Sequence, residues 1–191
     1  MKPDLDCWLD DPLVRVEHRG HSSAPADTLW QAARAVTLGE TSMLGRLVRW
    51  RIPGTRLDIS FDQLFRTPPF IVLEESQDYG QPALVCGLVG RIWTLRRDYP
   101  RLGEPEEFRQ WSRRGTARVL FAHWIEEPKA GDGAVLASEA RVEAIGSQGR
   151  LGVAAIRPLV RTFAHLIESD GILAAVRRAE RQNQATALRH D

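Results

Sequence analysis

The sequence has few of the residues that mark specialised classes of protein. Only two of its 191 residues are cysteines, Cys7 and Cys86, and they share no motif spacing. Two isolated thiols exclude a disulfide framework and are typical of a reducing compartment. The formal net charge is only +1, whereas nucleic-acid-binding domains are usually strongly basic. The composition therefore argues against a nucleic-acid partner and predicts a cytoplasmic protein.

Long apolar runs are also missing. No stretch approaches the roughly 18 consecutive apolar residues of a membrane-spanning helix, so we expect no integral membrane protein. Residues 1–6 are acidic where a signal peptide would be basic and then apolar. The length suits a single domain over residues 1–191. We expect its core at about 12–182, with loose termini at 1–11 and 183–191.

The motifs that carry catalysis or bind metal ions are absent from the sequence. It contains no Gly-x-Ser-x-Gly, and neither cysteine has the neighbourhood of a catalytic triad. His18 and His21 lie three apart on an expected strand, so they point to opposite faces and cannot readily share a metal ion. Gly146-Ser-Gln-Gly149 precedes a helix but lacks the Lys-Ser/Thr of a phosphate-binding loop. The sequence therefore predicts no catalytic residue, no metal site and no cofactor.

What the sequence does contain is an ordered series of hydrophobic patterns. Alternation over 14–21 predicts a strand, and two short helices are expected after it, to about 36 and over about 41–50. Four more strands are expected in two antiparallel pairs, at 70–75, 83–93, 117–126 and 134–145. Single helical turns are expected at 60–65 and 106–112.

The C-terminal part predicts one long helix, from about Gly149 to Gln182. Its apolar stripe comprises Val153, Ile156, Val160, Phe163, Ile167, Leu173 and Val176. A helix of ~30 residues is ~45 Å long, enough to cross a whole curved sheet. The predicted fold class is α+β: a curved antiparallel sheet wrapped around a long C-terminal helix, with two short helices after the first strand.

This layout resembles the START-like helix-grip superfamily (SRPBCC), which includes the birch pollen allergen, lipid-transfer domains and aromatic polyketide cyclases. Three stretches carry the resemblance: Val14–Ala33, Gly87–Trp93, and Leu136–Val142 with the helix that follows. The last two are similar to an uncharacterised bacterial branch of the superfamily. The chain departs from typical members at 53–69 and 94–116.

The resemblance implies a cavity for an apolar ligand between the sheet and the C-terminal helix. Small residues at several expected strand and helix positions would leave room for it: Ala83, Gly87, Ala122, Ala137, Ala140 and Ala155. The alternative is that large aromatic side chains fill that space, namely Trp30, Trp93, Trp124 and Phe121.

The candidate ligand-binding residues are Trp30, Arg91, Trp93, Phe121, His123, Glu139, Ile156, Val160 and Phe163. Arg91 lies in an apolar run, where a buried cation without a partner would be costly. We expect it in the cavity, compensated by Glu139, by backbone carbonyls or by the ligand. His123 is a candidate base or hydrogen-bond donor, with an ordinary core or surface histidine as the alternative.

Side-chain alternation leaves the direction of Arg91 open between two faces of its strand. On the face of Arg91 the side chains are small, as expected of a face that lines a cavity: Ala83, Val85, Gly87 and Val89. The opposite face carries bulkier side chains: Leu84, Cys86, Leu88 and Ile92. If that face is the one packed in the core, Arg91 lies in solvent.

The leading functional hypothesis is a non-catalytic protein, a monomer or homodimer, that binds a small apolar or amphipathic molecule under the C-terminal helix. The first alternative is a polyketide cyclase- or dehydratase-like enzyme, in which an inward Arg, His or Tyr polarises a carbonyl. The second is an interaction module that grips a partner peptide or a lipid chain without chemistry. The enzyme hypothesis requires two or more titratable side chains that converge in the cavity.

Overall fold

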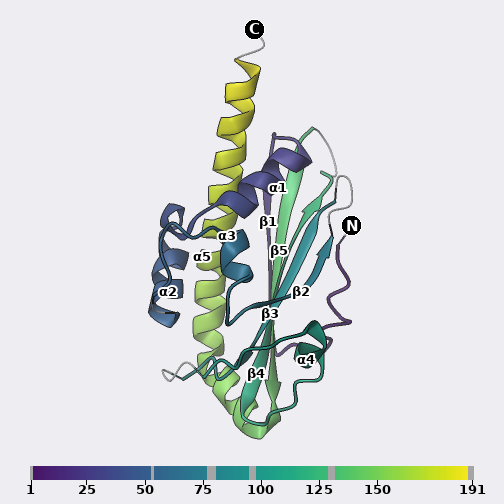
Figure 1. The fold of residues 1–191 in the computed structure, drawn as a ribbon, viewed down its shortest axis with the longest axis vertical. Helices are drawn as coiled ribbons and strands as arrows, with labels where there is room; N and C mark the ends of the chain where they lie inside the picture. The colour runs from purple at the N-terminus through teal and green to yellow at the C-terminus, as the bar shows by residue number, and fades with distance from the viewer. Residues whose placement is uncertain (1, 53, 77–80, 95–97, 129–131, 189–191) are drawn as a thin grey trace.

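A five-stranded antiparallel sheet forms one layer of the protein, and a long C-terminal helix lies along it (Figure 1). The structure is a computed structural model that describes residues 2–52, 54–76, 81–94, 98–128 and 132–188. Within the helices it gives the backbone alone at 51, 159–169 and 186–187. In chain order, the elements are β1 (Val14–Ser22), α1 (Ala26–Ala35), the 3₁₀ turn η1 (Leu38–Glu40), α2 (Met43–Arg51), α3 (Phe61–Phe65), β2 (Ile71–Ser76), β3 (Ala83–Gly90), α4 (Pro105–Arg109), β4 (Thr116–Glu126), β5 (Ala134–Ile145) and α5 (Gly146–Ala187).

The strand order in the sheet is β1-β5-β4-β3-β2, and every neighbouring pair is antiparallel. The first strand in the sequence therefore pairs with the last, from Val14 opposite Val142 to Ser22 opposite Ala134. The predicted fold class is confirmed: the protein is α+β, with an antiparallel sheet, a long C-terminal helix in a helix-grip arrangement, and short helices after the first strand.

The sheet has two buried faces, which we call the inner face and the outer face. The inner face packs against α5, and its side chains include Leu84, Cys86, Phe121, His123, Leu136 and Ser138. The outer face carries Val85, Val89, Leu120, Trp124, Glu139 and Arg141. All eight residues of β3 are buried, because helices or other chain segments cover the strand on both sides.

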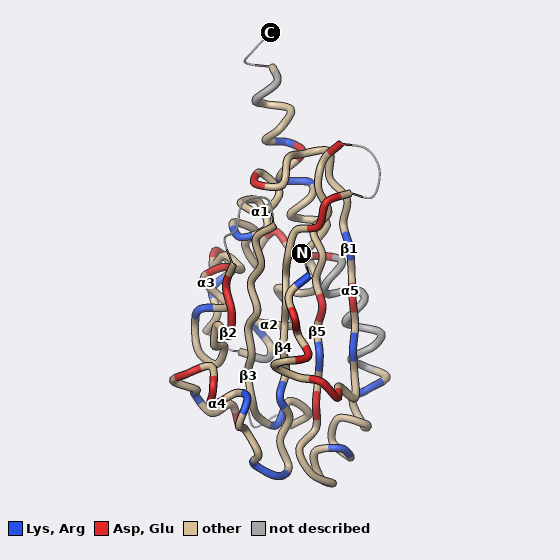
Figure 2. The backbone as a smooth tube through the Cα atoms, turned by 90° about the vertical axis from the view of Figure 1, so that its right-hand side faces the viewer, with Lys and Arg blue, Asp and Glu red and all other residues tan. Residues whose placement is uncertain are grey.

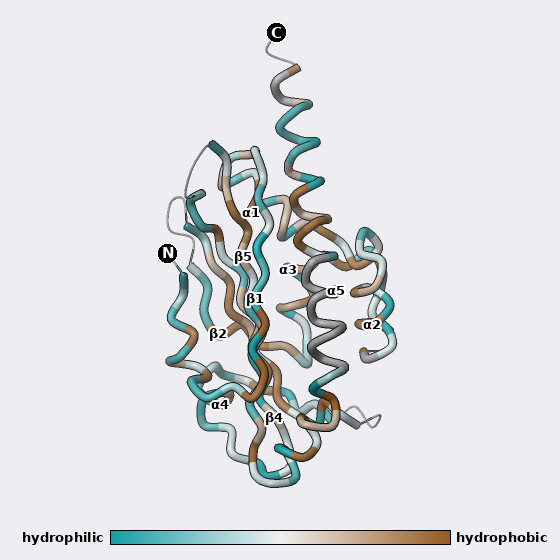
Figure 3. The backbone as a smooth tube through the Cα atoms, turned by 180° about the vertical axis from the view of Figure 1, so that it is seen from behind, coloured by the Kyte–Doolittle hydropathy of each residue, from teal (hydrophilic) through white to brown (hydrophobic). Residues whose placement is uncertain are grey.

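α5 runs alongside β1, and its C-terminal turns extend beyond the end of the sheet (Figures 1 and 3). Gly20 of β1 makes this close approach possible, since a Cβ atom there would lie 2.2 Å from the Cγ2 of Ile172. The predicted stripe is right at Val153 and Val176, which are buried, but wrong at Leu173, which is 53% exposed. Ile172, Ala175 and Ala179 are buried instead. The stripe residues Val160, Phe163 and Ile167 have side chains outside the described part of the chain.

Residues 2–11 were expected to be loose, but they pack against the outer face. Leu5 and Leu9 are 2% and 1% exposed, and Trp8 is buried beside them. They form one apolar cluster with Phe108 of α4 and with the outer side chains of β3 and β4. The physical reason is that the outer face carries its own apolar cluster, so it also needs a cover.

Candidate functional site

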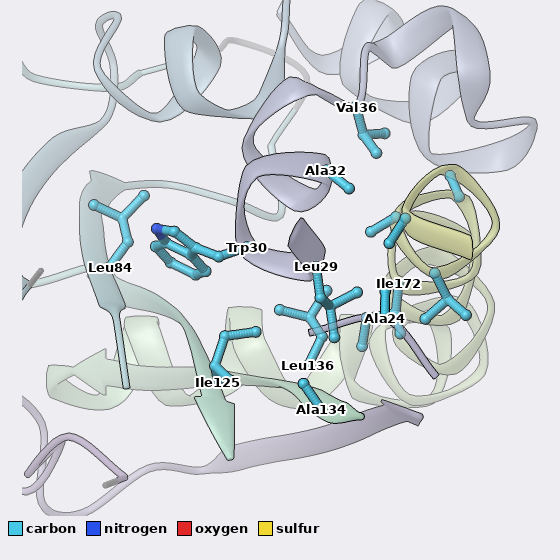
Figure 4. Packing of buried hydrophobic residues seen from close by; sticks show 14 of the residues in the cluster. Ala24, Leu29, Trp30, Ala32, Val36, Leu84, Ile125, Ala134, Leu136 and Ile172 are labelled. Carbon is cyan, nitrogen blue, oxygen red and sulfur yellow. The ribbon is translucent and has the colours of Figure 1, made fainter. Parts of the chain in front are cut away.

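A cavity of about 150 Å³ lies between the inner face and the helices that cover it. Its walls come from α1 (Trp30, Ala33, Arg34), α2 (Leu44, Val48), α3 (Phe61, Asp62, Leu64, Phe65) and α5 (Gly171, Ile172, Ala175), and from the sheet and the residue before it (Phe70, Leu84, Phe121, His123, Leu136, Ser138). Figure 4 shows how Trp30 of α1 reaches towards Leu84, and how Leu136 lies near Ile172 of α5. Carbon surface dominates this lining, so the cavity suits an apolar occupant.

Aromatic rings form one wall of the cavity. The ring of Phe65 lies 5.4 Å from that of Phe70, 6.1 Å from that of Phe121 and 5.2 Å from that of His123. A capping box positions the short helix α3: Gln63 N donates to Ser60 Oγ at 3.2 Å, and Ser60 N donates to Gln63 Oε1 at 3.4 Å. This local pair places Phe65 over the inner face.

His123 brings a polar atom into this apolar wall. It lies in the middle of β4, with Leu84 opposite it on β3 and Ser138 opposite it on β5. Its Nε2 atom is buried and has no hydrogen-bond partner among the described residues. Burial lowers the pKa of His123 to about 4, because an imidazolium would lose its hydration there. The imidazole is therefore neutral near pH 7.

The two charged residues in the cavity wall pair with each other. Arg34 Nη2 lies 2.9 Å from Asp62 Oδ1, and its Nε donates to the same oxygen at 3.0 Å. Asp62 also accepts a hydrogen bond from Arg66 Nη2 at 3.2 Å. These contacts link α1 to α3 and leave little charge to attract an ionic ligand.

The wall formed by α2 is attached to α5 through one carboxylate. Asp170 Oδ2 accepts hydrogen bonds from the backbone N–H groups of Met43 at 2.9 Å and Leu44 at 3.4 Å, and from Ser42 Oγ at 3.3 Å. The first N–H groups of a helix have no partner within it, so a carboxylate there caps the helix end and suits its dipole. Asp170 therefore holds α2 over the cavity.

Three of the candidate residues line the cavity as expected: Trp30, Phe121 and His123. Trp93 packs elsewhere, at the end of the inner face near Gly152, where an added Cβ would lie 2.2 Å from the Trp93 ring. Ile156 is half-buried on α5 and is not part of the described lining. The candidates Val160 and Phe163 have side chains outside the described part of the chain.

The expectation that Arg91 lies in the cavity is wrong. Arg91 follows the end of β3, its side chain is 42% exposed, and its Nε is 3.9 Å from Asp98 Oδ2. Gly90, with φ at +147°, breaks the strand alternation just before it. The smaller β3 side chains face outward instead, because Phe108 needs the space: a Cβ on Gly87 would lie 2.7 Å from its ring. Ala83, Ala122 and Ala137 belong to that same outer cluster.

Glu139 was also expected in the cavity, and this prediction is wrong too. It lies on the outer face, fully buried, within a cluster of opposite charges. Its carboxylate is 2.6 Å from Lys2 Nζ, 2.8 Å from Arg15 Nε and 2.6 Å from Arg141 Nε. Figure 2 shows charged residues of both signs along β1 and β5, with the N-terminus beside them.

The outer charge cluster also holds the N-terminal segment in place. Arg141 Nη1 donates to the backbone oxygen of Leu9 at 2.6 Å and to Asp6 Oδ1 at 2.5 Å. Burial alone would raise the pKa of Glu139, but hydrogen bonds from Lys2 and Arg141 outweigh it and keep the pKa below the usual range. Glu139 and Arg141, the two buried charges of this cluster, therefore each contact an opposite charge within the described part of the chain.

Sequence reasoning missed the residues of α3 and the strand start after it, above all Phe61, Phe65 and Phe70. Phe61 and Phe65 fall in the stretch 53–69, which departs from the resembled superfamily, and Phe70 follows it directly. A local signal was nevertheless present, because Ser60-x-x-Gln63 is the pattern of a capping box and predicts a helix start.

Three further features of the described residues concern metal binding, membrane spanning and thiol chemistry. No group of three or more His, Cys, Asp or Glu side chains among them gathers as a metal site. No helix in the described part of the chain is long and apolar enough to cross a membrane. Cys86 is buried in the inner face, and burial raises its pKa to about 12, so its thiol stays protonated.

Comparison with known proteins gives only distant likenesses. No family model matches the sequence, and no curated protein matches it. Two similar solved structures are of norcoclaurine synthase from Thalictrum flavum. The truncated enzyme is 11% identical with a TM-score of 0.35, over 83% of this chain and 90% of that chain. The complex with dopamine and hydroxybenzaldehyde is 12% identical with a TM-score of 0.31, over 90% of each chain.

Both TM-scores are below 0.5, and likeness at this level carries no information about substrate or reaction. The helix-grip arrangement is seen directly in the order of the strands and the position of α5. Membership of the START-like superfamily, and of its bacterial branch, stays a prediction from the three stretches of sequence.

Proposed function

We propose that the protein binds a small, uncharged, largely apolar molecule in the inner-face cavity and does not convert it chemically. The supporting observation is a cavity of about 150 Å³ lined mainly by aromatic and aliphatic side chains. An engineered protein cavity of about this size, lined by Leu, Ile and Phe, stays dry and binds benzene. The ligand is therefore about the size of one six-membered ring.

The cost of leaving such a cavity empty supports a role in binding. At ~24 cal/mol per Å³, a closed void of about 150 Å³ would cost roughly 3–4 kcal/mol, and a pocket that solvent can enter costs less. Ala33, Gly171 and Ala175 line the cavity, and larger apolar side chains at these positions would reduce the void. A bound ligand would recover the contacts that the empty cavity lacks.

Among the described lining residues, no second titratable group is free beside His123 for the enzyme alternatives. A cyclase or dehydratase needs converging groups that hold and polarise a carbonyl. Among the described lining residues, His123 is available, but Arg34 and Asp62 are engaged with each other. Binding without chemistry needs only the shape and the apolar surface. The free thiols Cys7 and Cys86 support a cytoplasmic location.

Thermal unfolding with toluene tests the proposal. At a toluene concentration ten times Kd, binding stabilises the folded state by about 1.4 kcal/mol, which raises the Tm by about 3–6 °C for a chain of this size. Ala175→Leu, which fills the cavity, should abolish this rise. Ala155→Leu is the matched control, because Ala155 lies exposed on the same helix. No rise in the wild type, or an equal rise in Ala175→Leu, would refute the proposal.

A further inference from the structure

We propose that His123 recognises a hydroxyl group on the ligand, so that the ligand is a small phenol or cyclic alcohol and not a pure hydrocarbon. This inference rests on the proposed function and specifies the chemistry of the molecule bound in that cavity. Its basis is one buried nitrogen atom, His123 Nε2, beside the aromatic rings of the cavity wall.

The surroundings of His123 explain why a ligand is the natural partner for this nitrogen. Its ring lies 5.2 Å from that of Phe65, and its neighbours across the strands are Leu84 and Ser138. All of these residues line the cavity together with His123. None of the described residues supplies a hydrogen bond to His123 Nε2. Burying a polar atom without a partner is unfavourable, so a group that arrives with the ligand removes that penalty.

A hydroxyl group fits this nitrogen better than other polar groups. In a neutral imidazole one ring nitrogen donates a hydrogen bond and the other accepts one. A hydroxyl both donates and accepts, so it can pair with Nε2 in either tautomer, whereas a carbonyl oxygen can pair only with N–H. The Ser138 side chain lines the cavity beside His123 and offers a second hydroxyl at the same place. A ligand with a single hydroxyl at one end can therefore keep its ring among Phe65, Phe70 and Phe121.

The charges around the cavity argue against an anionic ligand such as benzoate. Burial keeps His123 neutral near pH 7, so it offers no positive charge. Arg34, the described cation of the lining, lies 2.9 Å from Asp62 and would have to leave it to bind a carboxylate. Moving a carboxylate into an apolar cavity without a cation is strongly unfavourable.

The test uses two probes of matched size, phenol and toluene, which differ by a hydroxyl in place of a methyl group. Their affinities are measured by calorimetric titration at pH 7 for the wild type and for His123→Phe. Phenylalanine keeps the ring volume and removes the nitrogen atoms. We expect the ratio of phenol affinity to toluene affinity to fall at least tenfold in His123→Phe, with the toluene affinity unchanged or higher. His21→Phe, at an exposed histidine in β1, should leave the ratio unchanged.

The outcomes separate this inference from the proposed function. If both probes bind the wild type but the ratio is the same in His123→Phe, the inference about His123 is wrong and the cavity proposal stands. If neither probe binds the wild type, both proposals are wrong. Benzoate is the third probe, and tighter binding of benzoate than of phenol by the wild type would also overturn the inference.

Discussion

The two faces of the sheet differ in whether their buried polar groups have partners. On the outer face, the buried carboxylate of Glu139 contacts Lys2, Arg15 and Arg141 at 2.6–2.8 Å. On the inner face, the buried Nε2 of His123 has no partner among the described residues and lies beside a cavity of about 150 Å³. A polar group that the chain itself satisfies serves the fold, whereas one left unsatisfied next to empty space points to a molecule from outside.

The segments that cover the two faces also differ, in the size of the side chains they place against the sheet. The outer face is covered by the N-terminal segment and α4, whose buried Trp8 and Phe108 pack against the strands. The inner face is covered by helices that meet around Ala33, Gly171 and Ala175, where side-chain volume is missing. Each of the following predictions changes one face of the sheet. Together they test whether the inner face alone binds the ligand.

The largest effect is expected for Glu139→Gln on the outer face. Removing this charge leaves the buried Arg141 with only part of its compensation, and breaking a buried ion pair typically costs about 3–5 kcal/mol. Urea denaturation should show this loss, while the toluene affinity of the folded protein stays that of the wild type. Glu106→Gln, at an exposed ion pair in α4, should change stability by less than about 0.5 kcal/mol. A change in toluene affinity would mean that the two faces are coupled.

A smaller effect is expected from acid, through His123 on the inner face. The pKa of His123 is about 4 in the folded protein and about 6.5 in an unfolded chain, so between these pH values the unfolded state binds more protons. Stability should therefore fall as the pH drops below about 6.5, by roughly 2 kcal/mol at pH 5 relative to pH 8.

His123→Phe isolates this contribution, because both proteins share the carboxylates with lowered pKa, such as Glu139 and Glu126. The difference in unfolding free energy between the wild type and His123→Phe should change by about 2 kcal/mol between pH 8 and pH 5. A difference that does not vary with pH would show that the imidazole is not buried as a neutral group.

The smallest effect is expected for Asp170→Ala, which removes the cap that holds α2 over the cavity. Loss of a helix cap costs about 0.5–2 kcal/mol, with a value near 1 kcal/mol most common. Because Leu44 and Val48 of α2 line the cavity, the toluene affinity should fall as well. Glu180→Ala, on the same helix but away from α2, is the control. Equal toluene affinity in Asp170→Ala and the wild type would show that α2 contributes no binding surface.

The fold could be predicted from the sequence because its strands and helices carry local periodic signals. Alternation in β1, and the switch to helical spacing after β5, depend only on residues close together in the chain. The sequence could not show which side of a strand faces the cavity where apolar and polar residues do not alternate. Since all of β3 is buried, Ala83–Gly90 carries no contrast between polar and apolar sides, and the face of Arg91 was assigned wrongly.

The candidate site could be predicted only in part for a related reason. Trp30, Phe121 and His123 stand in well-defined periodic segments and line the cavity, and their role in binding stays a prediction. Phe65 comes from a five-residue helix, which was expected as a single turn but is too short for its pattern to show which side chain faces the sheet. The position of Glu139 depends on charges that are remote in the sequence, since Lys2 lies 137 residues away. Such contacts exist only after folding.

The pairing of β1 with β5 has a consequence for how the protein is made. About 120 residues separate the start of β1 from the start of β5, so at ~5–20 residues per second the ribosome delivers the partner strand some 6–24 seconds later. Throughout that interval β1 lacks β5, its neighbour in the described sheet. The charges on Arg15, Glu17 and Arg19 would then discourage the waiting strand from pairing with another nascent chain. Replacing them with threonine should therefore lower the soluble yield on synthesis more than the stability of the purified protein.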